Sequence, residues 1–406
     1  MFQTTKGRSL GSAFALVLAL LFLHGCEARH EAVPAALEVE AHIADFPDGM
    51  RYFPSDPVDI ALMEKEFVDS WEREKAFLHV DTLPPTTYLA LSGGGDKGAF
   101  SAGFLNGWTK EGTRPQEFKL VTGVSTGALI APFAFLGPAY DHNLTAMYTG
   151  VSEGDIAAKR FFYSVFLQDA LADTTPLAEL LKVHVTQSLL DAIAAEYAKG
   201  RLLYIGTTNL DARRPVVWNV TKIAATGRPE AVELVRKIML ASSAIPGAFP
   251  PVMFDVEARG KRYQEMHVDG GATTQVFVYW GAVNLKKLAE EHGADRDRQI
   301  YALVNARLDP EWGEVERRTL PITFMAIDTL IQYQTIGDLY RIYTHTQRDG
   351  THLNVAYISD DFREPHTADF DPAFMRKLYD FGFEKAAAGY VWMTEPPLRL
   401  GENTQQ

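Results

Sequence analysis

A serine flanked by glycines stands where a strand-like pattern gives way to a helix-like one. Phe118–Val121 is typical of a short buried strand, Gly123–Gly127 reads G-V-S-T-G, and Ala128–Ala131 begins an apolar stretch compatible with a helix. Strand, G-x-S-x-G and helix in this order are typical of a nucleophile elbow, whose serine occupies a sharp, strained turn between two glycines. The dipole of the following helix favours negative charge there. The pattern predicts Ser125 as a nucleophile, although an ordinary turn can carry the same residues.

A second glycine-rich run follows an earlier strand pattern. Tyr88–Ser92 resembles a strand, Gly93–Gly98 reads G-G-G-D-K-G, and Ala99–Leu105 is a plausible helix. Consecutive glycines leave main-chain N–H groups free to point at a ligand atom, and the helix dipole adds partial positive charge behind them. An oxyanion hole fits this arrangement best. The predicted oxyanion-hole residues are Gly93, Gly94, Gly95, Lys97 and Gly98.

The same run has two competing interpretations. It satisfies G-x-G-x-x-G, the pattern of a dinucleotide-binding loop, but no acidic residue ends a second strand about 20 residues later. Glu111 and Glu117 lie in a polar linker instead. A phosphate-binding P-loop is excluded because Lys97 lacks the required Gly-Lys-Ser/Thr spacing.

A carboxylate follows a third extended segment, Tyr263–Val268, in the run Asp269–Gly271 (D-G-G). Asp-Gly is a common turn signal, but a serine nucleophile needs a base, and Asp269 is the candidate. An α/β-hydrolase places a histidine after its acid. The histidines that follow Asp269 are His292, His345, His352 and His366. None stands in a convincing strand-end loop, so a triad has no support from the sequence.

The order and spacing of Gly93–Gly98, Gly123–Gly127 and Asp269–Gly271 resemble those of the patatin-like phospholipases. Thr207–Asp211 and Ala241–Pro251 agree with the same family. The resemblance is good over residues 88–276 and loose elsewhere. One position departs mildly from the family pattern, since D-G-G stands where D-G-A is also common.

The resemblance implies a catalytic Ser125–Asp269 dyad without histidine and an oxyanion hole at Gly93–Gly98, with Lys97 where Arg or Lys is usual. Gly270 and Gly271 complete the third motif. The alternation of strands and helices over residues 88–357 indicates an α/β layered fold with a mainly parallel sheet. The family's version of it is a three-layer α/β/α fold.

The chemistry of such a dyad follows from the residue types. The serine hydroxyl attacks an ester carbonyl, the aspartate takes its proton, and backbone amides bind the oxyanion. A solvated aspartate has a pKa near ~3.9 and is a weak base, so burial would strengthen it. Besides lipid ester hydrolysis, the dyad suits an acyltransferase or a thioesterase. A lipid-binding lipoprotein without turnover is disfavoured because Ser125, Asp269 and the triple glycine are all intact. No cofactor is predicted, and the histidine spacing offers no metal site.

The N-terminus predicts export and lipidation. Lys6 and Arg8 precede a 14-residue apolar stretch, Leu10–Leu23, which is short for a membrane span and suits a signal peptide. It ends in L-H-G-C, which resembles a bacterial lipoprotein box, although His24 departs from the usual small residue. Cys26 is the single cysteine of the chain, and we expect it to be lipidated. An ordinary signal peptide or an uncleaved anchor is the alternative, and either exports the chain.

Charge limits the partners. The net charge is −13 and becomes −15 once the signal peptide, with two basic residues, is removed. This balance argues against nucleic acid and against electrostatic docking on anionic lipid. The predicted partners are therefore a lipid ester substrate and a periplasm-facing or cell-surface membrane, reached through the anchor at Cys26.

Four segments are predicted: a signal peptide (1–25), a tether and N-terminal helix (26–84), the catalytic domain (85–284), and C-terminal strands and helices completing the same fold (285–406). We expect a tether over Glu27–Pro57 and helices at Asp59–Val80, Phe324–Tyr343 and Phe374–Ala388. Two aromatic runs after the elbow are predicted as core, with an acyl-chain wall as the alternative. They are Phe133–Leu136 and Phe161–Phe166. The rigid loop Ile245–Pro251 is expected to support the site without supplying catalytic groups.

Overall fold

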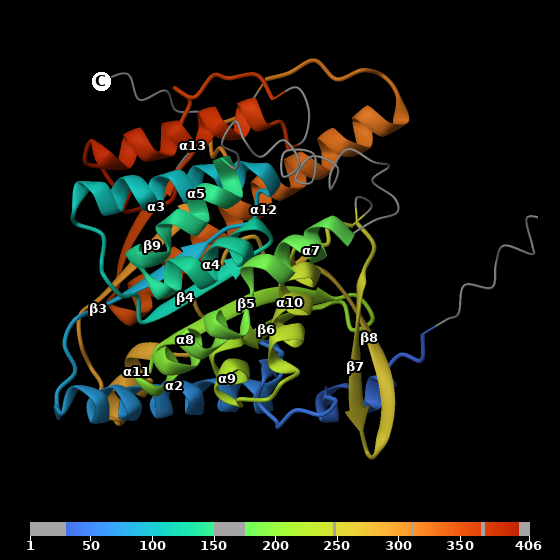
Figure 1. The fold of residues 1–406 in the computed structure, drawn as a ribbon, viewed down its shortest axis with the longest axis vertical. Helices are drawn as coiled ribbons and strands as arrows, with labels where there is room; N and C mark the ends of the chain where they lie inside the picture. The colour runs from blue at the N-terminus through green and yellow to red at the C-terminus, as the bar shows by residue number, and fades with distance from the viewer. Residues whose placement is uncertain (1–29, 150–174, 247–248, 311, 367–369, 398–406) are drawn as a thin grey trace, which may run out of the picture.

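The computed structural model describes residues 30–149, 175–246, 249–310, 312–366 and 370–397. The strands of these residues form one ten-stranded sheet (Figure 1). They are β1 (His42–Ile43), β2 (Arg51–Tyr52), β3 (Thr86–Leu91), β4 (Leu120–Val124), β5 (Leu202–Asn209), β6 (Arg214–Asn219), β7 (Val252–Ala258), β8 (Lys261–Asp269), β9 (Arg298–Val304) and β10 (His352–Tyr357). The order along the sheet is β1-β7-β8-β5-β4-β3-β9-β10, and β6 pairs with both β5 and β2.

The centre of this sheet is parallel. Strands β5, β4, β3, β9 and β10 run in one direction, and each pairs in parallel with its neighbour. Beyond β5 the strands β8, β7 and β1 continue the sheet in antiparallel pairing, as do β6 and β2. The prediction of a central, mainly parallel sheet is confirmed, with an antiparallel wing added at one side.

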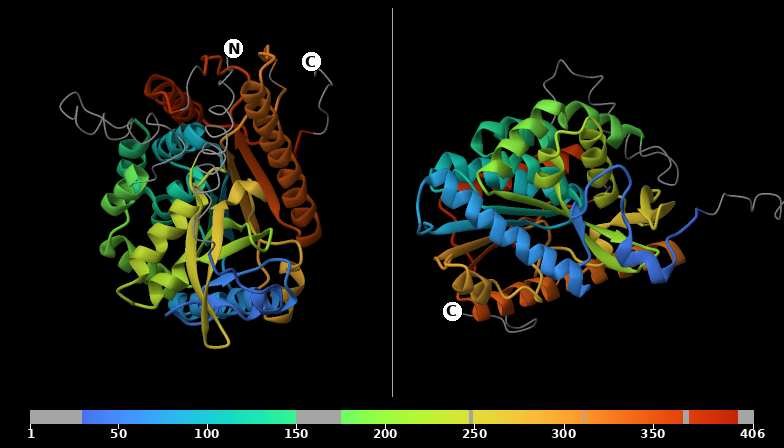
Figure 2. Two further views of the ribbon diagram at one scale, coloured as in Figure 1. Left: turned by 90° about the vertical axis from the view of Figure 1, so that its right-hand side faces the viewer. Right: turned by 90° about the horizontal axis from the view of Figure 1, so that it is seen from below.

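Helices cover both faces of the sheet (Figure 2). Along each central strand alternate side chains enter opposite cores, because successive residues of a strand point to opposite faces. In β3, Leu89 and Leu91 join one core, and Tyr88 and Ala90 join the other. The first core is covered by α3 (Ala99–Glu111), α4 (Thr126–Leu136), α5 (Asp141–Thr149), α7 (Thr175–His184), α8 (Gln187–Ala198), α9 (Val220–Ala225), α10 (Ala231–Ser242) and α13 (Pro372–Ala387). The second is covered by α2 (Pro57–Leu78), α11 (Leu285–Glu291) and α12 (Thr319–Asp349). The predicted three-layer α/β/α fold is confirmed.

The C-terminal segment belongs to the same layers. Strands β9 and β10 extend the sheet beyond β3, and α13 lies against α3. A Cβ atom at Gly103 or Gly107 of α3 would fall on a carbonyl oxygen of α13, so these two glycines allow the helices to touch along their backbones.

The segment predicted as a tether is folded instead. Its described part, residues 30–56, contains η1 (Ala35–Glu40), and its two short strands pair with β7 and β6. The Arg51 side chain is buried and forms an ion pair with Glu265 of β8. Each strand has only two residues, so neither is long enough to show the alternation of buried and exposed residues that marks a strand in a sequence. The tether prediction is therefore wrong for this part of the chain.

The predicted helices are present with shifted ends. Helix α2 begins at Pro57, because Asp56 accepts hydrogen bonds from the N–H groups of Val58 and Asp59. Helix α12 is longer than the predicted 324–343. The signal peptide, Cys26 and residues 161–166 lie outside the described residues. Within the described ranges, no helix combines the length and apolar character that crossing a membrane requires.

Candidate active site

Ser125 stands on a strained turn between β4 and α4. Its backbone has φ 54° and ψ −125°, an unfavourable combination for a residue with a side chain. Helix α4 begins at Thr126, two residues before the predicted start. A Cβ atom at Gly123 would fall on the carbonyl oxygen of Gly127, and one at Gly127 would fall on that of Leu91. Both elbow positions therefore require glycine, as the sequence pattern predicts.

A buried serine of α10 holds this turn in place. The Ser125 N–H donates to Ser242 Oγ at 2.9 Å, and Ser242 Oγ donates to the carbonyl of Gly206 in β5 at 2.7 Å. The sequence analysis placed Ser242 in a segment typical of the family but gave it no function. Only the folded structure brings its hydroxyl between the elbow and β5.

Strand β5 brings Asp269 next to Ser125. Val124, the last residue of β4, pairs with Gly206, and Asp269, the last residue of β8, pairs with Thr207. At Thr207, strand β6 pairs with one edge of β5 and β8 pairs with the other edge. Strand β4 pairs with the same edge as β8, so the ends of β4 and β8 meet there. Ser125 directly follows Val124, and the predicted nucleophile and base are therefore neighbours.

The Asp269 carboxylate is buried and incompletely bonded. Oδ1 accepts the N–H of Gly271 at 2.7 Å, whereas Oδ2 has no hydrogen-bond partner of ordinary geometry. The Ser125 hydroxyl is nevertheless close enough to lower the pKa of this carboxyl as a donor. Burial outweighs both donors and raises the pKa of Asp269 to about 7. The carboxylate is thus a much stronger base than a solvated aspartate.

The glycine loop places free amides beside the serine. Gly94 and Gly95 have φ values of 149° and 58°, and the loop enters the short turn η2 (Gly95–Gly98). Among the described residues, the N–H groups of Gly94 and Gly95 donate to no acceptor. A Cβ atom at Gly93 would lie 3.4 Å from Ser125 Cβ. The two free amides are therefore candidates to bind an oxyanion.

The other residues of the predicted oxyanion hole have different contacts. The Lys97 N–H already donates to the Gly94 carbonyl at 3.1 Å, and its ammonium lies 3.9 Å from Asp328 of α12. At Gly98, a Cβ atom would fall on Thr126 Oγ1, so this glycine lets α4 approach the loop. The backbone of Lys97 is therefore not a free donor, and Gly98 has a packing reason to be glycine.

Gln275 joins the two glycine motifs and was missed by the sequence analysis. Its carbonyl accepts the Gly93 N–H at 2.9 Å, and its Nε2 donates to the Gly271 carbonyl at 3.0 Å. Cβ atoms at Gly93 and Gly271 would each come within 2.6 Å of the Gln275 amide group. Glycine at position 271, the departure from the D-G-A form, thus leaves room for this side chain.

Two further residues support these loops from outside the motifs. Asp338 of α12 accepts the N–H groups of Gln275 and Val276 at 2.7 and 3.3 Å. Asn305, after β9, donates to the Ser92 carbonyl at 2.9 Å, and its backbone touches Gly94. Both are buried polar residues, but nothing in their local sequence distinguishes them from surface residues.

Comparison with known proteins relates part of the chain to one family. Residues 89–278 match the family model of the patatin-like phospholipases. The chain contains a patatin-like phospholipase domain. No curated protein matches the sequence.

Among solved structures the chain is similar to VipD from Legionella pneumophila, with 12% identity, a TM-score of 0.34, and coverage of 75% of this chain and 67% of VipD. It is also similar to ExoU from the type III secretion system of Pseudomonas aeruginosa, with 14% identity, a TM-score of 0.28, and coverage of 75% of this chain and 52% of ExoU. The chain thus spans about half the length of ExoU.

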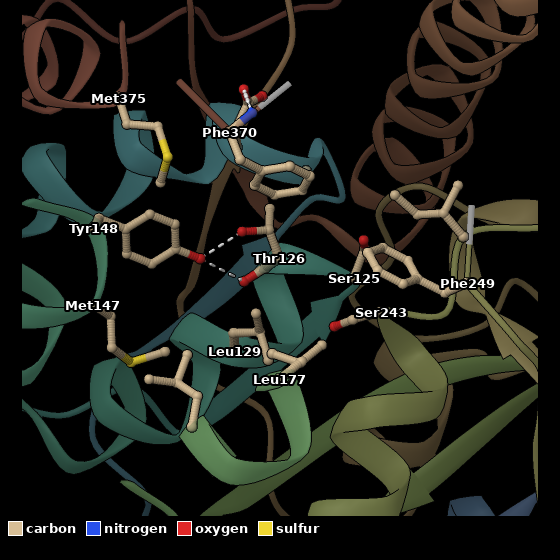
Figure 3. Close-up of a pocket in the computed structure, with 14 residues that line it drawn as sticks. Ser125, Thr126, Leu129, Met147, Tyr148, Leu177, Ser243, Phe249, Phe370 and Met375 are labelled. Atoms are coloured by element: carbon tan, nitrogen blue, oxygen red, sulfur yellow. Dashed lines mark hydrogen bonds between the residues drawn. The ribbon is translucent and has the colours of Figure 1, made fainter. Parts of the chain in front are cut away.

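An apolar pocket opens beside Ser125 in the patatin-like domain. Figure 3 shows Ser125 and Phe249 on one side of it, and Tyr148 and Met375 on the other. Half of its remaining lining is aliphatic: Leu129, Met147, Leu177, Leu180 and Ile245. The loop 245–251 therefore contributes apolar wall, whereas Phe133 and Phe135 are buried in the core, as the first interpretation of that run predicts.

The histidines that would complete a triad lie elsewhere. His292 caps α11, His345 stacks on Tyr279, His352 pairs with Asp297, and His366 donates to Asp96. In the described part of the chain, none of the four forms a hydrogen bond or ion pair with Ser125 or Asp269. The geometry therefore agrees with the dyad and gives no support to a triad.

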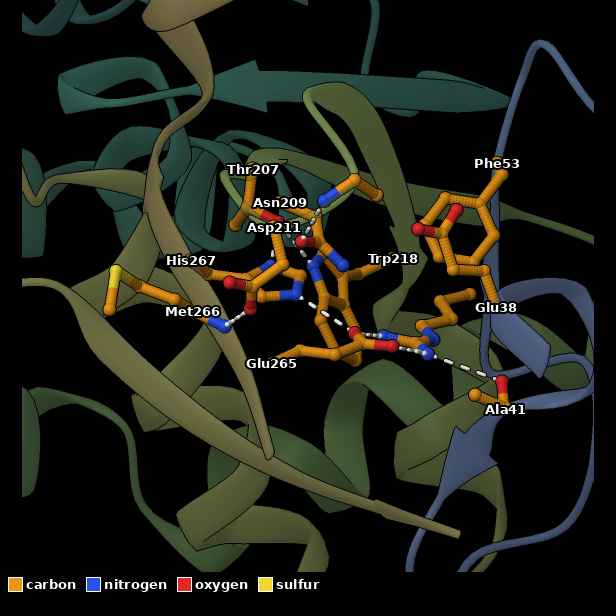
Figure 4. A network of polar contacts seen from close by, with 12 residues as sticks. Glu38, Ala41, Phe53, Thr207, Asn209, Asp211, Trp218, Glu265, Met266 and His267 are labelled. Atoms are coloured by element: carbon orange, nitrogen blue, oxygen red, sulfur yellow. Dashed lines mark hydrogen bonds and ion pairs between the residues drawn. The ribbon is translucent and has the colours of Figure 1, made fainter. Parts of the chain in front are cut away.

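His267, two residues before Asp269, belongs to a buried network that joins β8 to β5 (Figure 4). Thr207 Oγ1 accepts from Trp218 Nε1 at 2.8 Å and so donates its own proton to His267 Nδ1 at 2.9 Å. His267 Nε2 then donates to Glu265 at 3.1 Å. Burial lowers the pKa of His267, and the ion pair with Arg51 holds the pKa of Glu265 at about 2 despite its burial. A neutral histidine thus fixes β8 to β5 just before Asp269.

Proposed function

We propose that the chain hydrolyses carboxylic esters of lipids, with Ser125 as nucleophile and Asp269 as its base. The observation that carries this proposal is the position of the two side chains at the adjoining ends of β4 and β8, opposite consecutive residues of β5. The free amides of Gly94 and Gly95 supply the remaining part of an acyl-transfer site.

The reaction proceeds in two halves. Ser125 Oγ attacks the ester carbonyl as its proton passes to Asp269, and the amides of Gly94 and Gly95 bind the oxyanion. The tetrahedral intermediate collapses, and the departing alcohol takes the proton from Asp269. Water then attacks the acyl-enzyme, giving its proton to the same carboxylate, and the carboxylic acid leaves as Ser125 regains its proton. General-base help contributes roughly 10²–10⁴ in rate, and one oxyanion donor roughly 10²–10³.

The pocket supports a lipid substrate. Its lining beside Ser125 is largely aliphatic or aromatic, and its other polar members are Asp96, Thr126, Ser243 and the Tyr148 hydroxyl. Such a wall suits an acyl chain, whose burial is favourable in proportion to the apolar area removed from water. A phospholipid or an acylglycerol provides both the chain and the ester.

We propose further that the chain is exported and anchored through a lipid on Cys26. The support is the apolar stretch followed by L-H-G-C and the single cysteine of the chain. The described fold begins at His30, four residues after Cys26. A fully extended chain spans at most ~3.6 Å per residue, so His30 would lie within about 14 Å of the anchored cysteine.

A fluorophosphonate probe tests the nucleophile. The wild-type chain should be labelled and Ser125→Ala should not be. Ser243→Ala is a matched control, because Ser243 lines the same pocket and its hydroxyl has no hydrogen-bond partner among the described residues. Labelling of Ser125→Ala at the wild-type level would refute the assignment. Hydrolysis of phospholipid, lysophospholipid, acylglycerol and p-nitrophenyl esters then defines the substrate.

A further inference from the structure

Helix α12 is divided into a packed half and a bare half. From Thr335 onward its inner side is buried, with Leu339 fully inside the core. Before that point the helix leaves the body of the protein (orange, upper right in Figure 1). Ile327 of this half is 39% exposed, and four further apolar side chains are 44–69% exposed. They are Ile322, Met325, Leu330 and Tyr333, and we call them the apolar stripe.

The stripe occupies one side of the helix. At 100° per residue its four members fall within an arc of about 140°. Asp328 lies outside this arc, on the side that carries the buried Leu339 three turns later. Asp328 is itself 61% exposed, so the single charge and the apolar stripe lie on different sides of an exposed stretch of helix.

A tryptophan close to this helix in the sequence is also exposed. Trp312 is 93% exposed and stands in the loop before α12. Gln332 Nε2 donates to the carbonyl of Asp309 at 2.9 Å, which ties this loop to the bare half of α12. Trp and Tyr are the residues that favour the boundary between hydrocarbon and water.

This surface adjoins the mouth of the active site. Asp328 Oδ1 lies 3.9 Å from Lys97 Nζ. Lys97 belongs to the glycine loop, and its neighbours Gly95 and Asp96 line the pocket beside Ser125. The bare half of α12 thus stands next to the entrance through which a substrate reaches the serine.

We propose that the apolar stripe and Trp312 dock into the surface of a phospholipid bilayer. Monomeric proteins rarely expose contiguous apolar surface unless it binds something. Residues 319–333 contain one charged residue, Asp328, in a chain of net charge −13, so the surface complements a neutral interface and not a charged partner. A bilayer bound here would hold ester lipids beside the pocket. This last step rests on the proposed function.

Vesicle binding tests the proposal without turnover. The chain from Glu27 onward keeps all described residues and carries no lipid, and Ser125→Ala in this chain prevents hydrolysis. Leu330→Glu should weaken its binding to phosphatidylcholine vesicles at least about tenfold. Val58→Glu is the matched control, because Val58 is 65% exposed on α2, at the bottom of Figure 1 and away from this half of α12. It should stay within about twofold of the parent chain.

Each outcome has a defined meaning. Unchanged binding of Leu330→Glu, or equal loss in both variants, would overturn the proposal. A parent chain that sediments as a dimer and is made monomeric by Leu330→Glu, with vesicle binding intact, would assign the surface to a second copy and also overturn it. With Ser125 restored, both variants should hydrolyse a monomeric p-nitrophenyl ester at the parent rate. Absence of esterase activity together with Leu330-dependent binding would refute the proposed function and leave the docking surface standing.

Discussion

The replacement of Asp269 by asparagine should abolish activity and stabilise the fold at alkaline pH. Burial raises the pKa of Asp269 to about 7, from 3.8 for an exposed aspartate. Above pH 7 the folded protein therefore holds a buried negative charge at a free-energy cost that the unfolded chain does not have. Asparagine has nearly the same shape, remains neutral, and retains an oxygen that can accept the Gly271 N–H.

The size and sign of the effect follow from the two pKa values. Below pH 3.8 the carboxyl is protonated in both the folded and the unfolded state, so its ionisation does not lower the free energy of unfolding. As pH rises toward 7 the unfolded chain releases its proton while the folded chain keeps it, so wild-type stability falls and then levels off above pH 7. Each pKa unit corresponds to 1.36 kcal/mol, and the full difference is about 4 kcal/mol as an upper value. We expect Asp269→Asn to gain roughly 2–4 kcal/mol in unfolding free energy at pH 8, and little at pH 4.

Urea unfolding at pH 4, 6 and 8 measures this gain. Asp255→Asn, at an exposed position of β7, controls for the general effect of replacing a carboxylate. Ester hydrolysis by Asp269→Asn should fall by at least about 10³. A variant that is inactive but equally stabilised at every pH, or destabilised at pH 8, would refute the reasoning that the buried charge is the source of its basicity.

Three other predictions follow from the site. The wild-type kcat/KM should fall about tenfold per pH unit below pH 7, because the ionised form of Asp269 is the base; a flat profile from pH 5 to 8 would contradict this. Asp338→Ala should lower kcat and cost roughly 2–4 kcal/mol in urea unfolding, since two buried N–H groups lose their acceptor, while Asp338→Asn should restore most of both. Cys26→Ser should abolish incorporation of labelled palmitate; continued labelling would refute the anchor, because the chain has no second cysteine.

The parts of the site that could be predicted are those encoded by local patterns. The elbow at Ser125, the glycine loop after β3 and the carboxylate ending β8 each combine a strand pattern with glycines that the backbone requires. The start of α4 was misplaced by two residues, because Thr126 and Gly127 lack the apolar character that marks a helix in a sequence. Helical geometry there is imposed by packing against the glycine loop.

The parts that could not be predicted depend on distant contacts. Ser242 supports the elbow only because α10 places its hydroxyl between Ser125 and β5. Gln275 joins the two glycine motifs through contacts that cross nearly two hundred residues of chain. The N-terminal segment was interpreted as a tether because its strands have two residues each, too few to show a period, and because the burial of Arg51 depends on Glu265 of β8.

The catalytic unit is larger than the region that matches the family. The match ends at residue 278, yet Asn305 and Asp338 hold the loops of the candidate site, and Met375 lines the pocket. Helix α12 supplies Asp338 from its packed half and the apolar stripe from its bare half. A bilayer that binds the stripe therefore contacts the same helix that supports Gln275, and through it the amide of Gly93 beside the nucleophile. Since both halves are one continuous helix, the proposed docking surface and the support of Gln275 belong to the same element.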